Sequence, residues 1–392
     1  MDGNIWWWLT PIILLPVFFA MGWFAARVDM KAVLKQAKSV PTAFYASLDA
    51  LVDRNLGSAA RHLADMTDLL PAGDNTYELH LTLGKLYRQR GENDKAIHLH
   101  QALLEAPETV GEKRNQVLFE LGQDYQSAGL VDRAEQIFLG LQQGNMATQA
   151  RQVLLNIYQQ DRDWAKAIDT AQLLSHDEQT YRFEIAQFHC ELAQAALFKS
   201  DFEQARTNIA KALDANRKCA RANMILGDLE QKLGNYPAAV AAYTAIEKQN
   251  HAYLSMVGEK LYDAYDAQGE AAAGLAVLTG YLKTFPQLDL INVVYEKSLL
   301  LYGEEKAAET AVELVRQKPD LGGVYRLLGL RLSNLDPAWK SDADMMRGVI
   351  GRTLQKNVMY RCRHCHFKSQ VFFWHCPACN KWETFTPNKI EV

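Results

Sequence analysis

The chain has 392 residues, enough for two or three structural units, and its formal net charge is only −4. So balanced a charge gives no bulk electrostatic attraction for nucleic acid. With 22% charged residues and periodic stretches rich in Ala, Leu and Gln, the composition argues against disorder and favours an all-helical body.

The first stretch of the chain is apolar. Residues 5–26, IWWWLTPIILLPVFFAMGWFAA, contain no charged side chain, and about 20 apolar residues suffice for a helix to cross a bilayer. Tryptophans near both ends match the aromatic belts of membrane interfaces. A cleaved signal peptide is the alternative, but it requires a positive segment before a shorter apolar core, whereas the only side-chain charge here is Asp2. We therefore predict a transmembrane anchor over residues 1–26.

A short basic segment follows the anchor. Residues 27–40 contain one acid, Asp29, against four bases, Arg27, Lys31, Lys35 and Lys38. The positive-inside rule then predicts that the N-terminus faces outward and that the rest of the chain is cytoplasmic, where thiols stay reduced. We expect these residues to form a basic juxtamembrane linker near anionic head groups.

A pattern about 34 residues long recurs over residues 41–350. Its clearest copies share Leu-Gly, Tyr, Gly and Ala in the same order, at Leu83-Gly84, Tyr87, Gly91 and Ala96, then at Leu121-Gly122, Tyr125, Gly129 and Ala134, and again from Leu226-Gly227 to Ala239 and Tyr243. Weaker copies bring the number to about nine. The pattern resembles the tetratricopeptide repeat, a helix-turn-helix unit that stacks into a right-handed solenoid with a concave groove.

Each repeated position has a structural reason. The Gly of the Leu-Gly pair allows close approach between helices, and the later Gly ends the first helix of the pair. The alanines Ala96, Ala134, Ala167, Ala205 and Ala239 are expected to keep the second helix thin where it crosses the first. We interpret the aromatics Tyr87, Tyr125, Tyr158, Trp164 and Tyr243 as core residues.

Polar residues beside these aromatics are the candidates for the groove. They are Lys85, Arg88, Gln123, Gln126, Asn156 and Gln159, although ordinary solvated side chains remain the simpler interpretation. No phosphate-binding loop, zinc-protease motif, nucleophile elbow or dinucleotide fingerprint stands in a suitable context. We predict that the chain is not an enzyme.

The last forty residues contain two CxxC pairs, Cys362–Cys365 and Cys376–Cys379, separated by ten residues. Two such turns supply the four corners of a tetrahedral site for one ion about 2.3 Å from each sulfur, with no position left for substrate. A structural metal ion is therefore predicted, zinc first and iron as the alternative. Disulfides are less compatible with a cytoplasmic chain that has only six cysteines.

Other residues near the pairs leave alternatives open. His364, His366 or His375 could each replace a thiolate, and basic residues from Arg352 to Lys389 outnumber the acids. Part of this basic excess balances a tetrathiolate centre, so no nucleic acid partner is expected. The remaining cysteines, Cys190 and Cys219, are interpreted as small buried apolar residues.

The order of the parts carries a family resemblance over essentially the whole chain. An anchor at 1–26, a linker at 27–40, repeats at 41–350 including LTLGKLYRQRGENDKAI (81–97), and YRCRHCHF with FWHCPACNKW at 351–392 together resemble the lipopolysaccharide assembly protein B family. The resemblance implies a rubredoxin-like four-cysteine ribbon and a bacterial inner-membrane adaptor. The chain departs from the usual rubredoxin turn in two places. His366 follows the second cysteine, where Gly is usual, and Asn380 follows the fourth. His enters a left-handed turn less readily than Asn, so some strain is expected at the first turn.

The resemblance also implies partners. Such an adaptor brings the lipid A deacetylase LpxC to the membrane protease FtsH, and an inner-membrane regulatory protein of the lipopolysaccharide pathway antagonises it. A homodimer is a further possibility that the sequence leaves open. The competing functions are a rubredoxin-like electron carrier and a zinc ribbon that binds nucleic acid.

Overall fold

A computed structural model describes residues 19–21, 23, 42–67, 74–174, 181–317, 321–332, 335–356, 358–387 and 390–391. The predicted anchor, apart from four of its residues, and the predicted basic linker lie outside these ranges. Among the helices that are described, none combines the length and the apolar character that a bilayer crossing requires. The described chain divides into two compact units, Met1–Asp161 and Arg162–Val392.

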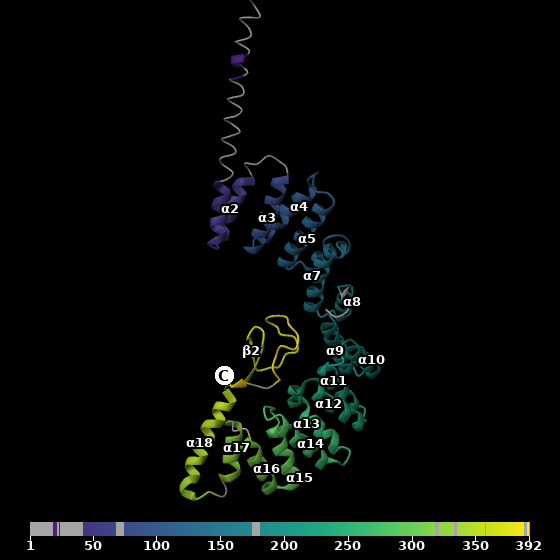
Figure 1. Cartoon of the computed structure of the whole chain (residues 1–392), viewed down its shortest axis with the longest axis vertical. Helices are drawn as coiled ribbons and strands as arrows, with labels where there is room; N and C mark the ends of the chain where they lie inside the picture. Colours follow the sequence, from purple (N-terminus) through teal and green to yellow (C-terminus); the bar gives the residue numbers. More distant parts are fainter. Residues whose placement is uncertain are drawn as a thin grey trace, which may run out of the picture. The chain divides into compact units, whose positions relative to one another are not determined.

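The first unit is entirely helical where it is described. Residues 42–52 are helical and precede the remaining helices of this unit (Figure 1). These are α2 (Leu56–Thr67), α3 (Asp74–Gln89), α4 (Asn93–Glu105), α5 (Glu112–Ser127), α6 (Val131–Gly140) and α7 (Ala147–Gln160). Consecutive helices from α2 to α7 pack against each other, and α3 also contacts α5, as a stack of antiparallel pairs requires.

The second unit continues the helical array and ends in a small sheet. Its helices are α8 (Trp164–Leu174), α9 (Arg182–Phe198), α10 (Phe202–Ala215), α11 (Ala220–Lys232), α12 (Tyr236–Asn250), the 3₁₀ turn η1 (His251–Tyr253), α13 (Leu254–Asp266), α14 (Ala271–Thr284), α15 (Ile291–Tyr302), α16 (Glu304–Gln317), α17 (Leu321–Arg331) and α18 (Pro337–Lys356). The boundary predicted between the repeats (41–350) and the C-terminal domain (351–392) falls inside helix α18.

The turns within the pairs use the predicted glycines. Gly91 and Gly129 have φ of 77° and 76°, in the left-handed region that favours glycine. The next N–H after each glycine closes the turn, with Glu92 donating to the Tyr87 carbonyl at 2.9 Å and Leu130 to the Tyr125 carbonyl at 2.8 Å. This hydrogen bond is the one by which a Schellman motif ends a helix.

The small residues of the pattern lie where helices cross. The five predicted alanines, Ala96, Ala134, Ala167, Ala205 and Ala239, are fully buried. Tyr125, Tyr158 and Tyr243 are buried as predicted and Tyr87 packs on the first unit's core. Trp164 has a different role, because its ring contacts the C-terminal ribbon described below.

The Leu-Gly glycines accommodate a ring from the second helix of each pair. A Cβ atom at Gly227 would lie 2.3 Å from a Tyr243 ring carbon, and one at Gly122 would lie 2.7 Å from Phe138.

We expect Gly227→Ala to destabilise the second unit by roughly 1–3 kcal/mol through overpacking. Gly280→Ala is the control, because this helical glycine in α14 has nothing within 4 Å of the added carbon. Thermal unfolding should show a lower midpoint for the first variant and an equal or higher midpoint for the second; equal shifts would contradict the packing role.

The chain ends in a three-stranded antiparallel sheet. Strand β1 (Val358–Arg361) lies between β2 (Lys368–Ser369) and β3 (Ile390–Glu391), with Tyr360 opposite Ser369 and Met359 opposite Ile390. Residues 358–387, called the ribbon from here on, carry both CxxC pairs. Their small core consists of Cys362, Cys376 and Phe385, so the sulfur positions and the aromatic core are built together.

Candidate metal centre and polar groove

The two CxxC turns of the ribbon have the same backbone pattern. In the first, Cys362 donates its N–H to the Phe367 carbonyl and accepts from the His366 N–H. In the second, Cys376 donates to the Lys381 carbonyl and accepts from the Asn380 N–H, at the same sequence offsets. The residues after the second cysteine of each pair, His366 and Asn380, have φ of 61° and 53°. This confirms the predicted left-handed turn at both positions, including the less favourable histidine.

This repeated turn brings the four sulfur atoms together. The Sγ atoms of Cys362, Cys365, Cys376 and Cys379 all lie within 4.8 Å of one another, and the Cys362–Cys379 and Cys365–Cys376 separations are 3.8 and 3.7 Å. Four ligands placed 2.3 Å from a tetrahedral zinc ion are separated by about 3.8 Å. The donor set and its spacing therefore fit one metal ion bound by four thiolates.

The surroundings of Cys362 favour its thiolate. Burial by itself raises the pKa of this thiol, but hydrogen bonds from the Thr384 side chain and from the N–H groups of Cys365 and His364 outweigh it and lower the pKa to about 6. Burial raises the pKa of Cys379 to about 12, with further contributions from the neighbouring sulfurs. A cation among the sulfurs would favour the charged form of all four.

The histidines near the turns are used elsewhere in the described structure. His366 contacts an Arg361 guanidinium nitrogen through Nδ1 at 2.9 Å, and His375 stacks on Trp382 with ring centroids 4.4 Å apart. His364 is exposed. The described metal-ligand group contains the four cysteines alone. The other two cysteines, Cys190 and Cys219, are fully buried as predicted, with sulfurs 3.7 Å apart.

The ribbon packs on helices that lie far from it in the sequence. The Trp382 ring contacts Trp164 of α8 and Phe188 of α9, both at 5.8 Å between centroids, and Trp374 lies 4.9 Å from Tyr253 of η1. Figure 1 shows the yellow ribbon on the inner side of the row of helices from α9 to α17. Although the ribbon follows α18 in the sequence, these ring contacts are with α8, α9 and η1.

Arg221 of α11 is the central polar residue of this contact. Its guanidinium lies 5.3 Å from the Trp374 centroid and 5.9 Å from that of Trp382, and the side chain is only 3% exposed. It forms an ion pair of 2.7 Å with Glu191. A cation within about 6 Å of an aromatic ring is favourable, the more so when water is excluded.

A partly buried hydrogen bond also links the ribbon to α9. Gln187 of α9 donates to the Glu383 carboxylate of the ribbon at 2.6 Å. Burial raises the pKa of Glu383, while Gln187 and Arg221 partly offset this effect. Glu383 also has a φ of 51°, a conformation that costs an L-residue about 1–2 kcal/mol. The packing of the ribbon therefore maintains a strained backbone position.

Sequence reasoning missed these docking residues. On the ribbon side a signal existed, because this segment of thirty residues carries two tryptophans, Trp374 and Trp382, that are not part of its own core. On the helix side there was none: Gln187 and Arg221 look like ordinary polar residues of amphipathic helices.

The first unit contains a polar groove of about 540 Å³ beside α3, α5 and α7, called the groove from here on. Three of the six groove candidates line it, namely Lys85, Gln123 and Asn156, whereas Arg88, Gln126 and Gln159 do not. The other lining residues are Gln116, Phe119, Glu120, Met146, Gln149, Gln152 and Val153. Carboxamides that can both donate and accept hydrogen bonds therefore predominate in this groove.

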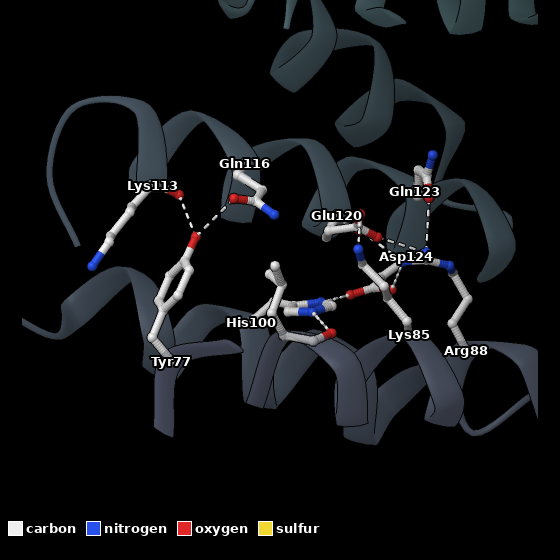
Figure 2. A network of polar contacts seen from close by, with 10 residues as sticks. Tyr77, Lys85, Arg88, His100, Lys113, Gln116, Glu120, Gln123 and Asp124 are labelled. Carbon is white, nitrogen blue, oxygen red and sulfur yellow. Dashed lines mark hydrogen bonds and ion pairs between the residues drawn. The ribbon is translucent and has the colours of Figure 1, made fainter. Parts of the chain in front are cut away.

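A network of ion pairs shares Lys85 and Glu120 with the lining of the groove (Figure 2). Arg88 of α3 binds both Glu120 at 2.7 Å and Asp124 at 2.6 Å on α5, and Lys85 reaches Glu120 at 3.0 Å. The buried His100 of α4 points its Nδ1 atom toward Asp124. Arg88 is thus a structural residue rather than a groove residue, and the charge of Lys85 is largely balanced by Glu120.

Comparisons with known proteins agree with both parts. Residues 360–387 match the family model described as a rubredoxin metal binding domain, and residues 79–114 and 190–253 match tetratricopeptide repeat models. The chain is 30% identical to lipopolysaccharide assembly protein B of Escherichia coli K12 over 96% of its own length and 97% of that protein's. The chain belongs to the lipopolysaccharide assembly protein B family. Lipopolysaccharide assembly protein B of Haemophilus influenzae is 26% identical over 96% of this chain and 97% of its own length.

Solved structures of tetratricopeptide proteins are also similar in part. A tetratricopeptide repeat protein from Parabacteroides merdae matches 75% of this chain and 98% of its own, at 17% identity and a TM-score of 0.25. The TPR2AB domain of yeast Sti1 in a pHSP90 complex matches 72% and 98%, at 14% identity and a TM-score of 0.31. The family models and the described helices make the chain an all-α array of tetratricopeptide repeats, with a C-terminal four-cysteine site capable of binding one metal ion.

Proposed function

We propose that this chain is a membrane-anchored adaptor of lipopolysaccharide assembly that promotes degradation of the deacetylase LpxC by the protease FtsH. The observation that carries the proposal is family membership over the whole length: 30% identity extends over 96% of this chain and 97% of the relative. In this proposal the chain is a scaffold, and proteolysis takes place on its partner.

Two surfaces support a role in binding. The groove of the first unit offers carboxamides and a balanced Lys85–Glu120 pair, a combination that can hydrogen-bond to the backbone of an extended peptide without demanding charge on it. In the second unit the ribbon lies on the inner side of the helical row (Figure 1) and adds its own exposed surface there. A single ion held by Cys362, Cys365, Cys376 and Cys379 would supply folding energy and no open coordination position.

Membrane attachment makes weak contacts sufficient. An adaptor tethered by residues 1–26 meets a protease of the same membrane at a raised effective concentration, so each contact needs only modest affinity. The inner-membrane regulatory protein of the pathway would meet it in the same way. We further propose zinc as the ion. Zinc has no redox chemistry, and a scaffold, unlike an electron carrier, needs none.

Crosslinking from the groove tests the partners. The photoreactive residue benzoylphenylalanine replaces the exposed groove residue Gln152 in one variant, and the exposed Gln136 of α6, outside the groove, in a control. After irradiation of membranes, LpxC or FtsH should be captured by the Gln152 variant and not by the Gln136 variant. Equal capture at both positions, or capture of neither protein, would contradict the proposed role of the groove.

The anchor makes a separate prediction about topology. Reporter enzymes active only in the periplasm or only in the cytoplasm are fused after Lys38. Because Arg27, Lys31 and Lys35 follow the apolar span, the cytoplasmic reporter should be active and the periplasmic one silent. The opposite pattern would overturn the orientation and, with it, access to a cytoplasmic deacetylase.

A further inference from the structure

The first helix of the repeat array has its bulky side chains on the outside. Over residues 42–52 the large apolar residues Phe44, Tyr45, Leu48 and Val52 are 45%, 68%, 41% and 81% exposed. Small residues face the interior instead, with Ser47 at 1% and Ala50 at 8% exposure, and Ala50 packs with α2. Ala43 and Leu51 also pack on this core, so the helix is apolar on its inner face and on part of its outer face, where a surface helix is usually polar.

These exposed residues form one continuous face. Residues 44, 48 and 52 are spaced by four, and position 45 lies next to this line, so the four side chains occupy one arc of about 100° over two turns. The stripe is about 12 Å long. Repeat arrays generally need a polar outer face on their terminal helices to remain soluble. An apolar face at this end therefore indicates that something other than water covers it.

The position of this helix in the chain determines what covers it. Fifteen residues, 27–41, separate it from the 22-residue apolar segment that we assign as the anchor. Even fully extended, fifteen residues span at most about 50 Å, and as a helix about 22 Å. The helix is thus tethered within reach of the bilayer surface.

Charge supports the same occupant. The intervening segment carries Arg27, Lys31, Lys35 and Lys38 against Asp29, and basic residues close to an anionic leaflet are attracted to it. On the helix itself Asp49 and Asp53 are exposed but lie to one side of the apolar arc. Tyr45, whose ring centroid lies 6.0 Å from that of Phe44, is of the residue type that is enriched at the head-group level.

We propose that the face formed by Phe44, Tyr45, Leu48 and Val52 binds the lipid surface of the membrane, so that the array is seated on the bilayer as well as tethered to it. Seating of this kind orients the first unit relative to the membrane and restricts where partners can approach. The inference rests on the membrane anchoring in the proposed function, and extends it from a tether to a lipid-binding surface.

Photocrosslinking of the full-length chain in native membranes tests the inference. Benzoylphenylalanine replaces Leu48 in one variant and Leu139 of α6 in the control, because both are leucines of the first unit with similar exposure, 41% and 49%. After irradiation, mass spectrometry of the purified chain should find phospholipid adducts at position 48 at least ten times more often than at position 139.

The other outcomes would overturn it. Adducts at position 48 to a protein, to a second copy or to the chain's own residues 27–41, without lipid, would assign the face to that occupant. Equal numbers of lipid adducts at both positions would show that the photoreactive residue labels lipid non-specifically. Membrane fractionation separates the two claims: a membrane-bound chain without lipid adducts at position 48 contradicts this inference alone, whereas a chain lost from membranes contradicts the anchor as well.

Discussion

Replacing Cys362 by Ser should remove the metal ion and unfold the ribbon while the helices of the second unit persist. The ribbon has a small core in which the cysteines are themselves the buried residues, so binding energy is folding energy, on the order of 10 kcal/mol or more for a site of this kind. Elemental analysis should find no bound metal in the variant and one ion per chain in the parent. Far-UV circular dichroism should change little, because the ribbon contributes no helix.

A matched control separates the site from thiol loss in general. Cys190→Ala removes an equally buried thiol outside the ribbon and should leave the metal content unchanged. If a Cys362→Ser, Cys376→Ser double variant still held one zinc per chain, the ligand assignment would be wrong. The visible spectrum of the parent adds a test of the metal, since zinc tetrathiolate is colourless and a strongly coloured ferric centre would revive the redox alternative.

Removing the Trp382 side chain should detach a folded, metal-loaded ribbon from the helices. Trp382 is 7% exposed and contacts Trp164, Phe188 and Arg221. Truncating a buried tryptophan to alanine costs about 3–5 kcal/mol, which we expect to exceed the stability of a contact between two small surfaces. The exposed Trp339 of α18, at 67%, provides the control, and Trp339→Ala should change stability by less than about 0.5 kcal/mol.

Hydrogen exchange distinguishes detachment from unfolding. In Trp382→Ala the amides of α9 and α11 should lose protection while the metal stays bound. Arg221→Lys should produce part of the same effect, because lysine keeps the charge but not the planar group between two indole rings. Loss of metal from Trp382→Ala would contradict the picture, since the tryptophan would then be part of the ribbon's own fold.

The repeats were readable from sequence because their signals are local. Gly91 and Gly129 end helices through hydrogen bonds that span five residues, and Gly84 and Gly227 each lie against a ring of the following helix. Spacing along the chain is therefore enough to predict them. The two CxxC turns are local in the same sense, down to the left-handed residues His366 and Asn380.

The packing of the ribbon on the helices could not be predicted from the sequence, because the residues in contact lie far apart along the chain. Gln187 and Glu383 are 196 residues apart, and nothing in the residues around Arg221 marks it as a partner for two tryptophans. Similarly, Arg88 was predicted to face the groove because it lies on α3 beside the repeat aromatic Tyr87. Only the positions of Glu120 and Asp124 on the next repeat draw it into a buried network.

The adaptor role is tested most directly by the lifetime of the deacetylase. Protein synthesis is stopped in cells with the intact chain, in depleted cells, and in depleted cells that make residues 27–392, and the LpxC remaining is followed with time. We predict that depletion lengthens the half-life of LpxC and that the fragment without its anchor fails to shorten it again. An LpxC half-life unchanged by depletion would contradict the adaptor account.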